Sequence, residues 1–280
     1  MLWLRLFCAH GWYSAVLILC ACCCLQLSAA SVIAEPAATA ACKLSMQVQH
    51  FPPRMIKTEL AGQSHWRGFN VDLFRLLVGK IGCQPLFQEL PWGRSLLLLQ
   101  QGELAAMSNM SLNTERQQYA EFIGPFLLEQ IVAIGPVGLQ PQVASLASLR
   151  LHALNIGLMQ GIYYGPEFAK ASQEPMLAAK LVYVTTNRQK LQLLYSGRVQ
   201  VVFEDLLNYQ LLRQAGQMDA GQFQPLFTLY RNGVYFAFSK KTIPAAQLQQ
   251  LHQAWQQLVA SGELKQLQQQ YQVTDFVLSP

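Results

Sequence analysis

The chain has 280 residues, of which 52% are hydrophobic and only 12% are charged, with 20 basic against 15 acidic side chains. High hydrophobicity with few charges excludes an intrinsically disordered protein. A formal net charge of +5 over this length is too dilute to indicate a nucleic-acid-binding protein. The length allows one large domain or two modest ones.

The first 34 residues have the composition of an export signal. Arg5 is their only charged residue, an apolar run covers about residues 12–27, and small residues follow at 28–30. We therefore predict a cleaved secretory signal peptide over residues 1–34. Two alternatives stay open: residues 19–22 resemble a lipoprotein cleavage box, and the apolar run almost reaches the length of a membrane anchor.

From residue 42 onward, short apolar runs alternate with amphipathic stretches, which is typical of βα units and parallel sheets. Helices are predicted where apolar residues recur at helical spacing, at 71–81 and 96–100, and in two glutamine-rich stretches at 245–260 and 263–271. Strands are predicted, in chain order, at 44–49, 85–90, 105–109, 130–135, 154–159, 181–184, 199–203 and 234–238.

Two segments interrupt this pattern and are interpreted as linkers, one at 135–141 and one at 229–233. Two crossings of the chain indicate a discontinuous first lobe that surrounds an inserted second lobe. We predict lobe 1 at 42–133 and 233–280, and lobe 2 at 134–232.

Only two cysteines lie beyond the predicted signal peptide. Cys42 and Cys83 each precede a predicted strand. If these strands are parallel neighbours, both thiols lie at the same sheet edge and can form a bridge, which an oxidising compartment favours. We expect a Cys42–Cys83 disulfide; two free buried thiols are the alternative.

The motifs of several common active sites are absent from the sequence. Its five histidines are scattered without metal-ligand spacing, so no metal site is expected. There is no P-loop, dinucleotide fingerprint or nucleophile elbow, so we expect no cofactor and no catalytic residue. Glycines at 157, 161 and 165 favour a turn that opens a helix, whose amide groups would face an anion. These observations indicate a binding protein rather than an enzyme.

Several runs between residues 66 and 126 occur in a characteristic order: Gly-Phe-Asn-Val-Asp-Leu at 68–73, Leu-Pro-Trp-Gly-Arg at 90–94, Leu-Gln-Gln-Gly-Glu at 99–103, Ser-Asn-Met-Ser-Leu-Asn-Thr-Glu-Arg at 108–116, and Phe-Ile-Gly-Pro-Phe at 122–126. With these motifs, residues 42–271 resemble the family-3 periplasmic solute-binding proteins, the amino-acid-type receptors of ABC transporters. The resemblance implies an α/β, two-lobe periplasmic-binding-protein-like (type II) fold with mixed, mostly parallel sheets and lobe 2 inserted into lobe 1.

The resemblance also implies a carboxylate clamp made by the Ser111 hydroxyl and the Arg116 guanidinium, whose planar fork matches a carboxylate. A surface cation paired with Glu115 or Glu121 is the alternative role for Arg116. The position of Asp205 would receive an α-ammonium group, or cap a helix, or do both.

Further ligand contacts are implied by the same resemblance. Phe51 and Trp92 are expected to be aromatic walls, with core packing as the alternative. Gly161, with Gln160, would close the carboxylate from the second lobe through helix-end amides. Asn109 completes the expected ligand-binding set.

The function implied is capture of a small carboxylate-bearing, amino-acid-like solute in the cleft between the lobes, by a monomeric periplasmic protein that delivers it to an ABC permease at the inner membrane. Two alternatives are kept: a periplasmic sensory or accessory binding module without a permease, and a cyclohexadienyl-type dehydratase on the same fold. The dehydratase would need a general acid, for which Glu204, Asp205 and His50 are the candidates.

Overall fold

The computed structural model describes residues 42–273, which form ten β-strands, ten α-helices and one short 3-10 helix. In chain order they are β1 (Lys43–Val48), β2 (Ile56–Leu60), β3 (Gln63–Arg67), α1 (Phe69–Gly79), β4 (Gln84–Glu89), α2 (Trp92–Gln101), β5 (Ala106–Ser111), α3 (Thr114–Gln117), β6 (Ala120–Pro136), η1 (Val137–Leu139), α4 (Leu146–Leu151), β7 (Ile156–Met159), α5 (Pro166–Ala171), α6 (Pro175–Ala178), β8 (Leu181–Val184), α7 (Asn187–Tyr195), β9 (Val201–Asp205), α8 (Leu206–Gln214), β10 (Phe223–Ser239), α9 (Ala245–Ala260) and α10 (Glu263–Gln270).

Eight of these strands form one mixed sheet in the order β4-β1-β5-β10-β6-β9-β7-β8. Strand β1 pairs in parallel with β4 and β5, and β7 pairs in parallel with β8 and β9. The long strands β6 and β10 pair antiparallel with each other along most of their length, and they join the two parallel groups. The fold is therefore α/β and periplasmic-binding-protein-like.

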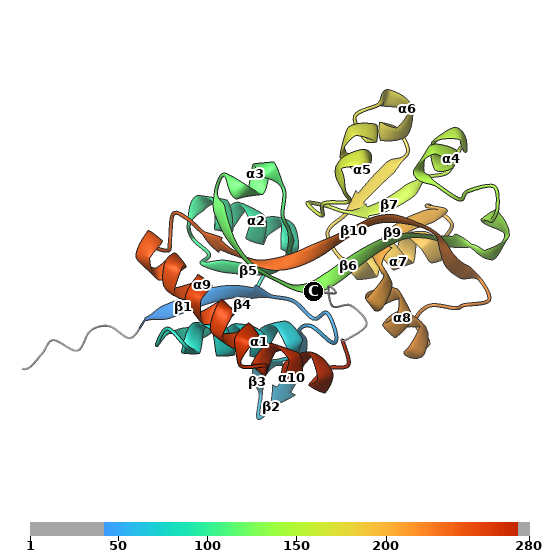
Figure 1. The fold of residues 1–280 in the computed structure, drawn as a ribbon. Coiled ribbons are helices and arrows are strands. Elements are labelled where there is room, and N and C mark those ends of the chain that lie inside the picture. Colours follow the sequence, from blue (N-terminus) through green and yellow to red (C-terminus); the bar gives the residue numbers. More distant parts are fainter. Residues whose placement is uncertain (1–41, 274–280) are drawn as a thin grey trace, which may run out of the picture. The chain divides into compact units, whose positions relative to one another are not determined.

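Figure 1 shows helices gathered around each end of the sheet, with β6 and β10 running through both groups. We call β1–β5 with α1–α3, α9 and α10 the first lobe, and β7–β9 with α4–α8 the second lobe. Each lobe has its own apolar clusters, and aromatic packing is central to both. The Phe126 and Phe236 rings, from β6 and β10, lie 4.7 Å apart in the cluster of the first lobe, and the Phe168 and Phe203 rings lie 5.1 Å apart in that of the second.

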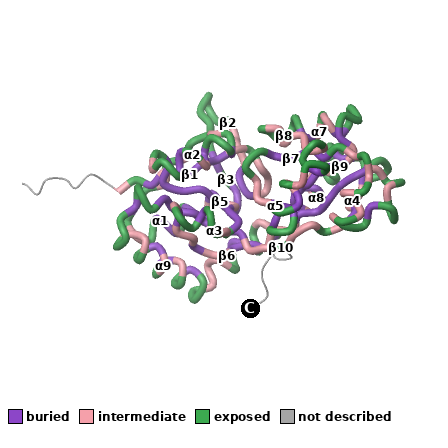
Figure 2. The backbone as a smooth tube through the Cα atoms, turned by 90° about the horizontal axis from the view of Figure 1, so that it is seen from above, coloured by how far each residue is buried: buried purple, intermediate pink, exposed green. Residues whose placement is uncertain are grey.

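The burial pattern agrees with this layering. Strands β7 and β9 are buried along their whole length, as expected for parallel strands covered on both faces (Figure 2). Helices start and stop at conventional signals: capping boxes open α4 and α7, and Gly102, in the left-handed conformation with φ 88°, ends α2.

Each strand predicted from the sequence is present, but two predictions of local structure were wrong. The predicted linker at 229–233 lies inside β10, and the predicted strand 130–135 is only the second half of β6. The other linker, 135–141, covers the end of β6 and then η1. The predicted lobe boundaries near residues 133 and 233 fall inside these long strands and stay a prediction.

The hairpin β2–β3 was not predicted. Its residues are mostly polar and exposed, and the two strands pair only with each other among the described residues. A sequence search for apolar alternation therefore has little to detect there.

Cys42 and Cys83 form a disulfide, with their Cα atoms 4.6 Å apart. The register pairs Lys43 with Gln84, so both cysteines sit directly before the paired ends of parallel neighbours. The predicted disulfide is therefore present, and it joins the ends of two neighbouring parallel strands as expected. The signal peptide predicted at 1–34 lies outside the described residues, and within 42–273 no helix combines the length and apolar character needed to cross a membrane.

Candidate ligand-binding site

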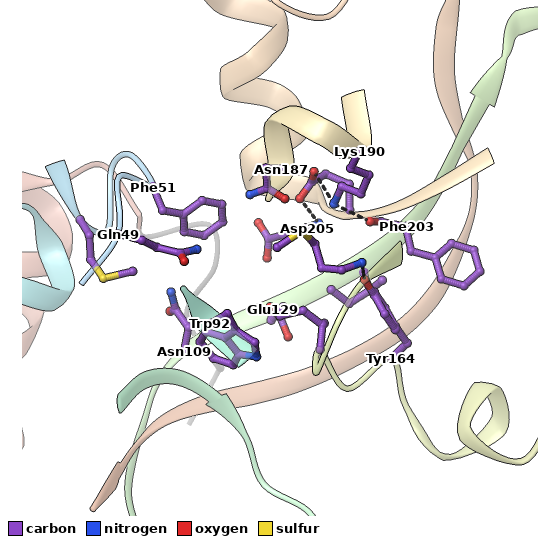
Figure 3. Close-up of a pocket in the computed structure, with 15 residues that line it drawn as sticks. Gln49, Phe51, Trp92, Asn109, Glu129, Tyr164, Asn187, Lys190, Phe203 and Asp205 are labelled. Carbon is purple, nitrogen blue, oxygen red and sulfur yellow. Dashed lines mark hydrogen bonds and ion pairs between the residues drawn. The ribbon is translucent and has the colours of Figure 1, made fainter. Parts of the chain in front are cut away.

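A narrow cavity lies between the two lobes (Figure 3). Gln49 and Phe51 approach it from the first lobe, while Asn187, Lys190 and Asp205 approach from the second. The described residues that line it are Gln49, Phe51, Met55, Trp92, Asn109, Glu129, Ile131, Met159, Ile162, Tyr164, Asn187, Lys190, Phe203, Glu204 and Asp205. Apolar walls with a few polar groups are typical of a small-molecule site.

Four aromatic side chains line the cavity, and two of them, Phe51 and Trp92, were expected from the sequence. Phe51 lies at the base of a tight loop, in which its backbone exchanges two hydrogen bonds with Met55, at 2.7 and 2.9 Å. Trp92 is the first residue of α2, and its Nε1 donates to the Gly161 carbonyl across the lobes at 3.2 Å. Both predicted aromatic walls therefore line the cavity.

The tip of the loop after β1 carries a buried arginine that the sequence did not single out. Arg54 Nη2 donates to Asp205 Oδ2 at 3.2 Å, and the two side chains are only 2% and 5% exposed. The start of α1 holds this loop, because the Asn70 amide donates to the Arg54 carbonyl. Gly68 permits the close approach, since a Cβ there would lie 2.6 Å from that carbonyl oxygen and φ is 118°.

Asp205 ends β9 and caps α8. Its Oδ1 accepts from the Asn208 amide at 3.1 Å while its Oδ2 accepts from Arg54. The helix cap considered from sequence is present, and the same carboxylate lines the cavity.

A second buried ion pair lies beside the first. Lys190 Nζ, on α7, is 2.9 Å from Glu204 Oε2, and the two side chains are 3% and 4% exposed. The contact lacks hydrogen-bond geometry: Lys190 donates to the Phe203 carbonyl, and Glu204 Oε2 has no hydrogen-bond partner. The other oxygen, Oε1, accepts from the Asp205 amide at 3.0 Å.

Glu129, on β6, lies between these pairs and the first lobe. Among the described residues, the only hydrogen bond to its carboxyl group comes from the Ser111 hydroxyl, at 3.5 Å. Burial and the neighbouring charge of Asp205 raise the pKa of Glu129 to about 8, against the opposing effects of Arg54 and Arg116. This side chain therefore holds a proton near neutral pH.

Asn109 reaches the cavity through an irregularity in β5. Its φ is 57°, in the left-handed region that asparagine tolerates better than most residues. Asn70 Nδ2 donates to Asn109 Oδ1 at 3.0 Å and fixes its orientation.

The residues of the predicted carboxylate clamp adjoin the cavity rather than line it. Arg116 is buried, and its guanidinium donates to the carbonyls of Ser111 and Gly161, both at 3.0 Å. Desolvation lowers the pKa of Arg116. The alternative pairing with Glu115 or Glu121 is not among the ion pairs of the described residues.

Gly161 takes part through its carbonyl, which accepts from both Trp92 and Arg116. The helix-end amides predicted there are not at this position, because α5 begins at Pro166. A Cβ on Gly161 would lie 2.8 Å from Leu96 Cδ1, so the absence of a side chain lets the lobes meet.

Phe51, Trp92, Asn109 and Asp205 thus line one cavity, and Arg116, Ser111 and Gly161 form a hydrogen-bonded group beside it. Arg54, Glu129 and Lys190 were not singled out from the sequence, and none of them belongs to a recognisable local motif. Of the dehydratase candidates, Glu204 and Asp205 line the cavity, whereas His50 does not. Within 42–273 no three His, Cys, Asp or Glu residues are grouped to hold a metal.

Two α/β lobes joined by two long strands, with a polar and aromatic cavity between them, define a solute-binding protein. Residues 48–274 match the family of bacterial extracellular solute-binding proteins, family 3, and the chain belongs to this family. No curated protein sequence matches the chain.

Three solved structures illustrate the range of proteins that share the fold. The amino acid ABC transporter substrate-binding protein AbpA from Streptococcus pneumoniae, bound to L-arginine, is 17% identical with a TM-score of 0.65, over 82% of this chain and 94% of that one. A histidine kinase sensor domain with similarity to periplasmic binding proteins is 15% identical with a TM-score of 0.69, over 85% and 98%. The ancestral amino acid-binding protein AncCDT-1, a precursor of cyclohexadienyl dehydratase, is 18% identical with a TM-score of 0.64, over 82% and 94%. At these identities the likeness establishes the fold.

Proposed function

We propose that this protein is an exported, non-enzymatic receptor that captures a small amino-acid-like solute between its lobes for ABC transport. The observation that carries the proposal is a cavity whose walls come from both lobes. Its polar groups include the carboxylates of two buried ion pairs, those of Asp205 and Glu204. A ligand that contacts both lobes stabilises the closed form, because only that form makes both sets of contacts.

The two ends of an amino acid would meet different groups. Asp205 would receive the ammonium group, while Arg116 and Ser111 would receive the carboxylate. In the structure Arg116 already donates to the Gly161 carbonyl, so the ligand carboxylate would replace that carbonyl as acceptor. The L-arginine bound to the pneumococcal protein AbpA supports this class of solute.

The remaining parts of the proposal concern the cell. A signal peptide over residues 1–34, cleaved or carrying a lipid, would place a monomeric protein in the periplasm. There it would deliver its solute to an ABC permease at the inner membrane, and the similarity to AbpA, an amino acid ABC transporter substrate-binding protein, supports this role.

Ligand-induced thermal stabilisation of Arg116 variants tests the clamp. With a panel of L-amino acids, Arg116→Ala is expected to weaken binding at least about 30-fold, because charge-assisted hydrogen bonds worth about 2 kcal/mol are lost. Arg116→Lys keeps the charge without the fork and is expected to lose about tenfold. Arg67→Ala, on the exposed hairpin, is the control.

If Arg116→Ala still shifts its melting temperature with ligand as the unaltered protein does, the clamp is wrongly placed. Small molecules released from natively purified protein and identified by mass spectrometry name the ligand independently. Loss of solute uptake on deletion of the gene supports the transport role, while intact uptake supports the sensory alternative.

The dehydratase is a second candidate, and one observation favours it. Glu129 holds a proton near neutral pH inside the cavity, which is what a general acid requires. Incubation of the protein with prephenate decides the matter: release of phenylpyruvate supports the enzyme, and unchanged prephenate supports the receptor.

A further inference from the structure

The described residues that line the cavity include more carboxyl groups than cationic groups. Three carboxylates line it, those of Glu129, Glu204 and Asp205, against a single lining cation, Lys190. Lys190 forms an ion pair with Glu204. Arg54, which is buried and does not line the cavity, forms an ion pair with Asp205. Of the three carboxyl groups, only that of Glu129 is in no ion pair with another of residues 42–273.

The groups around Glu129 leave it without a cationic partner of the protein. Asp205 and Glu204 from β9 repel its charge, and Arg54 is committed to Asp205. Arg116 from α3 donates to two backbone carbonyls instead. The remaining neighbours are uncharged: the Ser111 hydroxyl, at 3.5 Å, and the phenols of Tyr164 and Tyr230, whose pKa values are raised chiefly by burial.

A buried carboxyl group in this position has two ways to avoid an unpaired charge. It holds a proton, or it meets a cationic group brought by the ligand. The aromatic rings of Phe51 and Trp92 in the same lining also attract positive charge, and the Arg54 guanidinium already lies 5.2 Å from the Phe51 ring.

We infer that Glu129 selects the charge of the ligand, so that the site takes an amino-acid-like solute with a cationic side chain in preference to neutral or acidic ones. This inference rests on the proposed function and names the substrate class of the same cavity. The cationic group displaces the proton from Glu129 and takes its place, and the proton is released to solvent.

The exchange has a measurable pH dependence. Because the pKa of Glu129 is about 8, affinity for a cationic solute rises up to tenfold per pH unit between pH 6 and 8 and then levels off. A neutral solute of the same shape leaves the proton in place, so its affinity stays flat over this range.

Isothermal titration with two matched pairs of solutes tests the inference. L-Arginine and L-citrulline have nearly the same shape but differ by one charge, and L-ornithine and L-glutamine form a shorter pair. We expect at least tenfold tighter binding of the cationic member at pH 8, with proton release detected by comparing buffers of different ionisation enthalpy.

Variants at Glu129 connect the preference to this side chain. Glu129→Gln is expected to reduce the preference at least tenfold and to abolish the pH dependence, while Glu129→Asp keeps the preference. Glu121→Gln, on the same strand but outside the cavity, is the matched control and is expected to behave like the unaltered protein.

The outcomes separate this inference from the function on which it rests. If the neutral members bind as tightly as the cationic ones, or if Glu129→Gln keeps the preference, the charge selection is wrong and the receptor function stands. If none of the four solutes binds, the charge selection is also overturned, and the ligand found by mass spectrometry then decides the receptor function separately.

Discussion

The buried pair of Arg54 and Asp205 gives the sharpest test of the structure. Asp205→Asn removes the negative charge but keeps the helix cap, because asparagine and aspartate cap helices about equally well. It leaves the Arg54 guanidinium, which is 2% exposed, without its partner. We therefore predict a loss of stability that comes almost entirely from the broken ion pair and not from the helix cap.

The magnitude follows from the burial. Removing one partner of a buried ion pair costs about 3 to 5 kcal/mol. We expect the lower end, about 3 kcal/mol, because Arg54 keeps its position 5.2 Å from the Phe51 ring and Glu129 can ionise beside it. For a protein of this size, that loss lowers the melting temperature by about 6 to 12 °C.

Urea unfolding and thermal melting of the ligand-free protein measure the effect. Asp205→Ala should cost about 1 kcal/mol more, since the cap is lost as well. Combining Asp205→Asn with Arg54→Met removes both charges and should cost less than the sum of the single changes. Asp219→Asn, at an exposed position, is the control.

A cost of less than about 1 kcal/mol for Asp205→Asn, the range of exposed ion pairs, would show that Arg54 does not depend on a buried partner. Additive single and double variants would lead to the same conclusion, because two residues that form a buried pair must be energetically coupled.

Three further predictions concern other parts of the protein. Reduction of the Cys42–Cys83 bridge, which closes 41 residues, should cost about 4 kcal/mol in urea unfolding; an unchanged midpoint with reductant would refute this. Gly68→Ala should cost about 2 kcal/mol or more, because φ is 118° and the new Cβ meets the Arg54 carbonyl; a melting temperature within 2 °C of the unaltered protein, roughly the shift for 1 kcal/mol, would argue against that contact. Because the pKa of Glu129 is raised from 4.5 to about 8 on folding, its contribution to stability is complete below about pH 4.5 and is lost as pH rises towards 8, at up to about 1.4 kcal/mol per unit. Glu129→Gln should flatten this slope between pH 5 and 8, and equal slopes in the two proteins would exclude it.

The elements that the sequence predicted well are those with strong local signals. The strand 181–184 is observed as β8 with the same bounds, because an apolar run flanked by polar residues marks it. The first half of β6 was not predicted, since Gly124 and Pro125 interrupt its pattern. Its neighbour β10 supplies the hydrogen bonds that keep this stretch extended.

The cavity residues that could be predicted from the sequence are those that follow a strand or belong to a motif. Trp92 and Asp205 were found in this way, at the start of a helix and the end of a strand. Arg54 was not, because it lies in a loop with no motif and its partner is 151 residues away. Glu129 was not, because nothing in its own strand distinguishes it from a solvated glutamate.

The sequence by itself indicated the family, the eight strands of the large sheet and the expected disulfide, because each depends on local patterns or on the ends of two paired strands. Only the tertiary structure decided which charges are paired. The energy of a charge depends on burial and on neighbours from other elements, and for Glu129 these come from β5, β9 and the loop that carries Arg54. That environment makes Glu129 a candidate for selecting the charge of the ligand side chain.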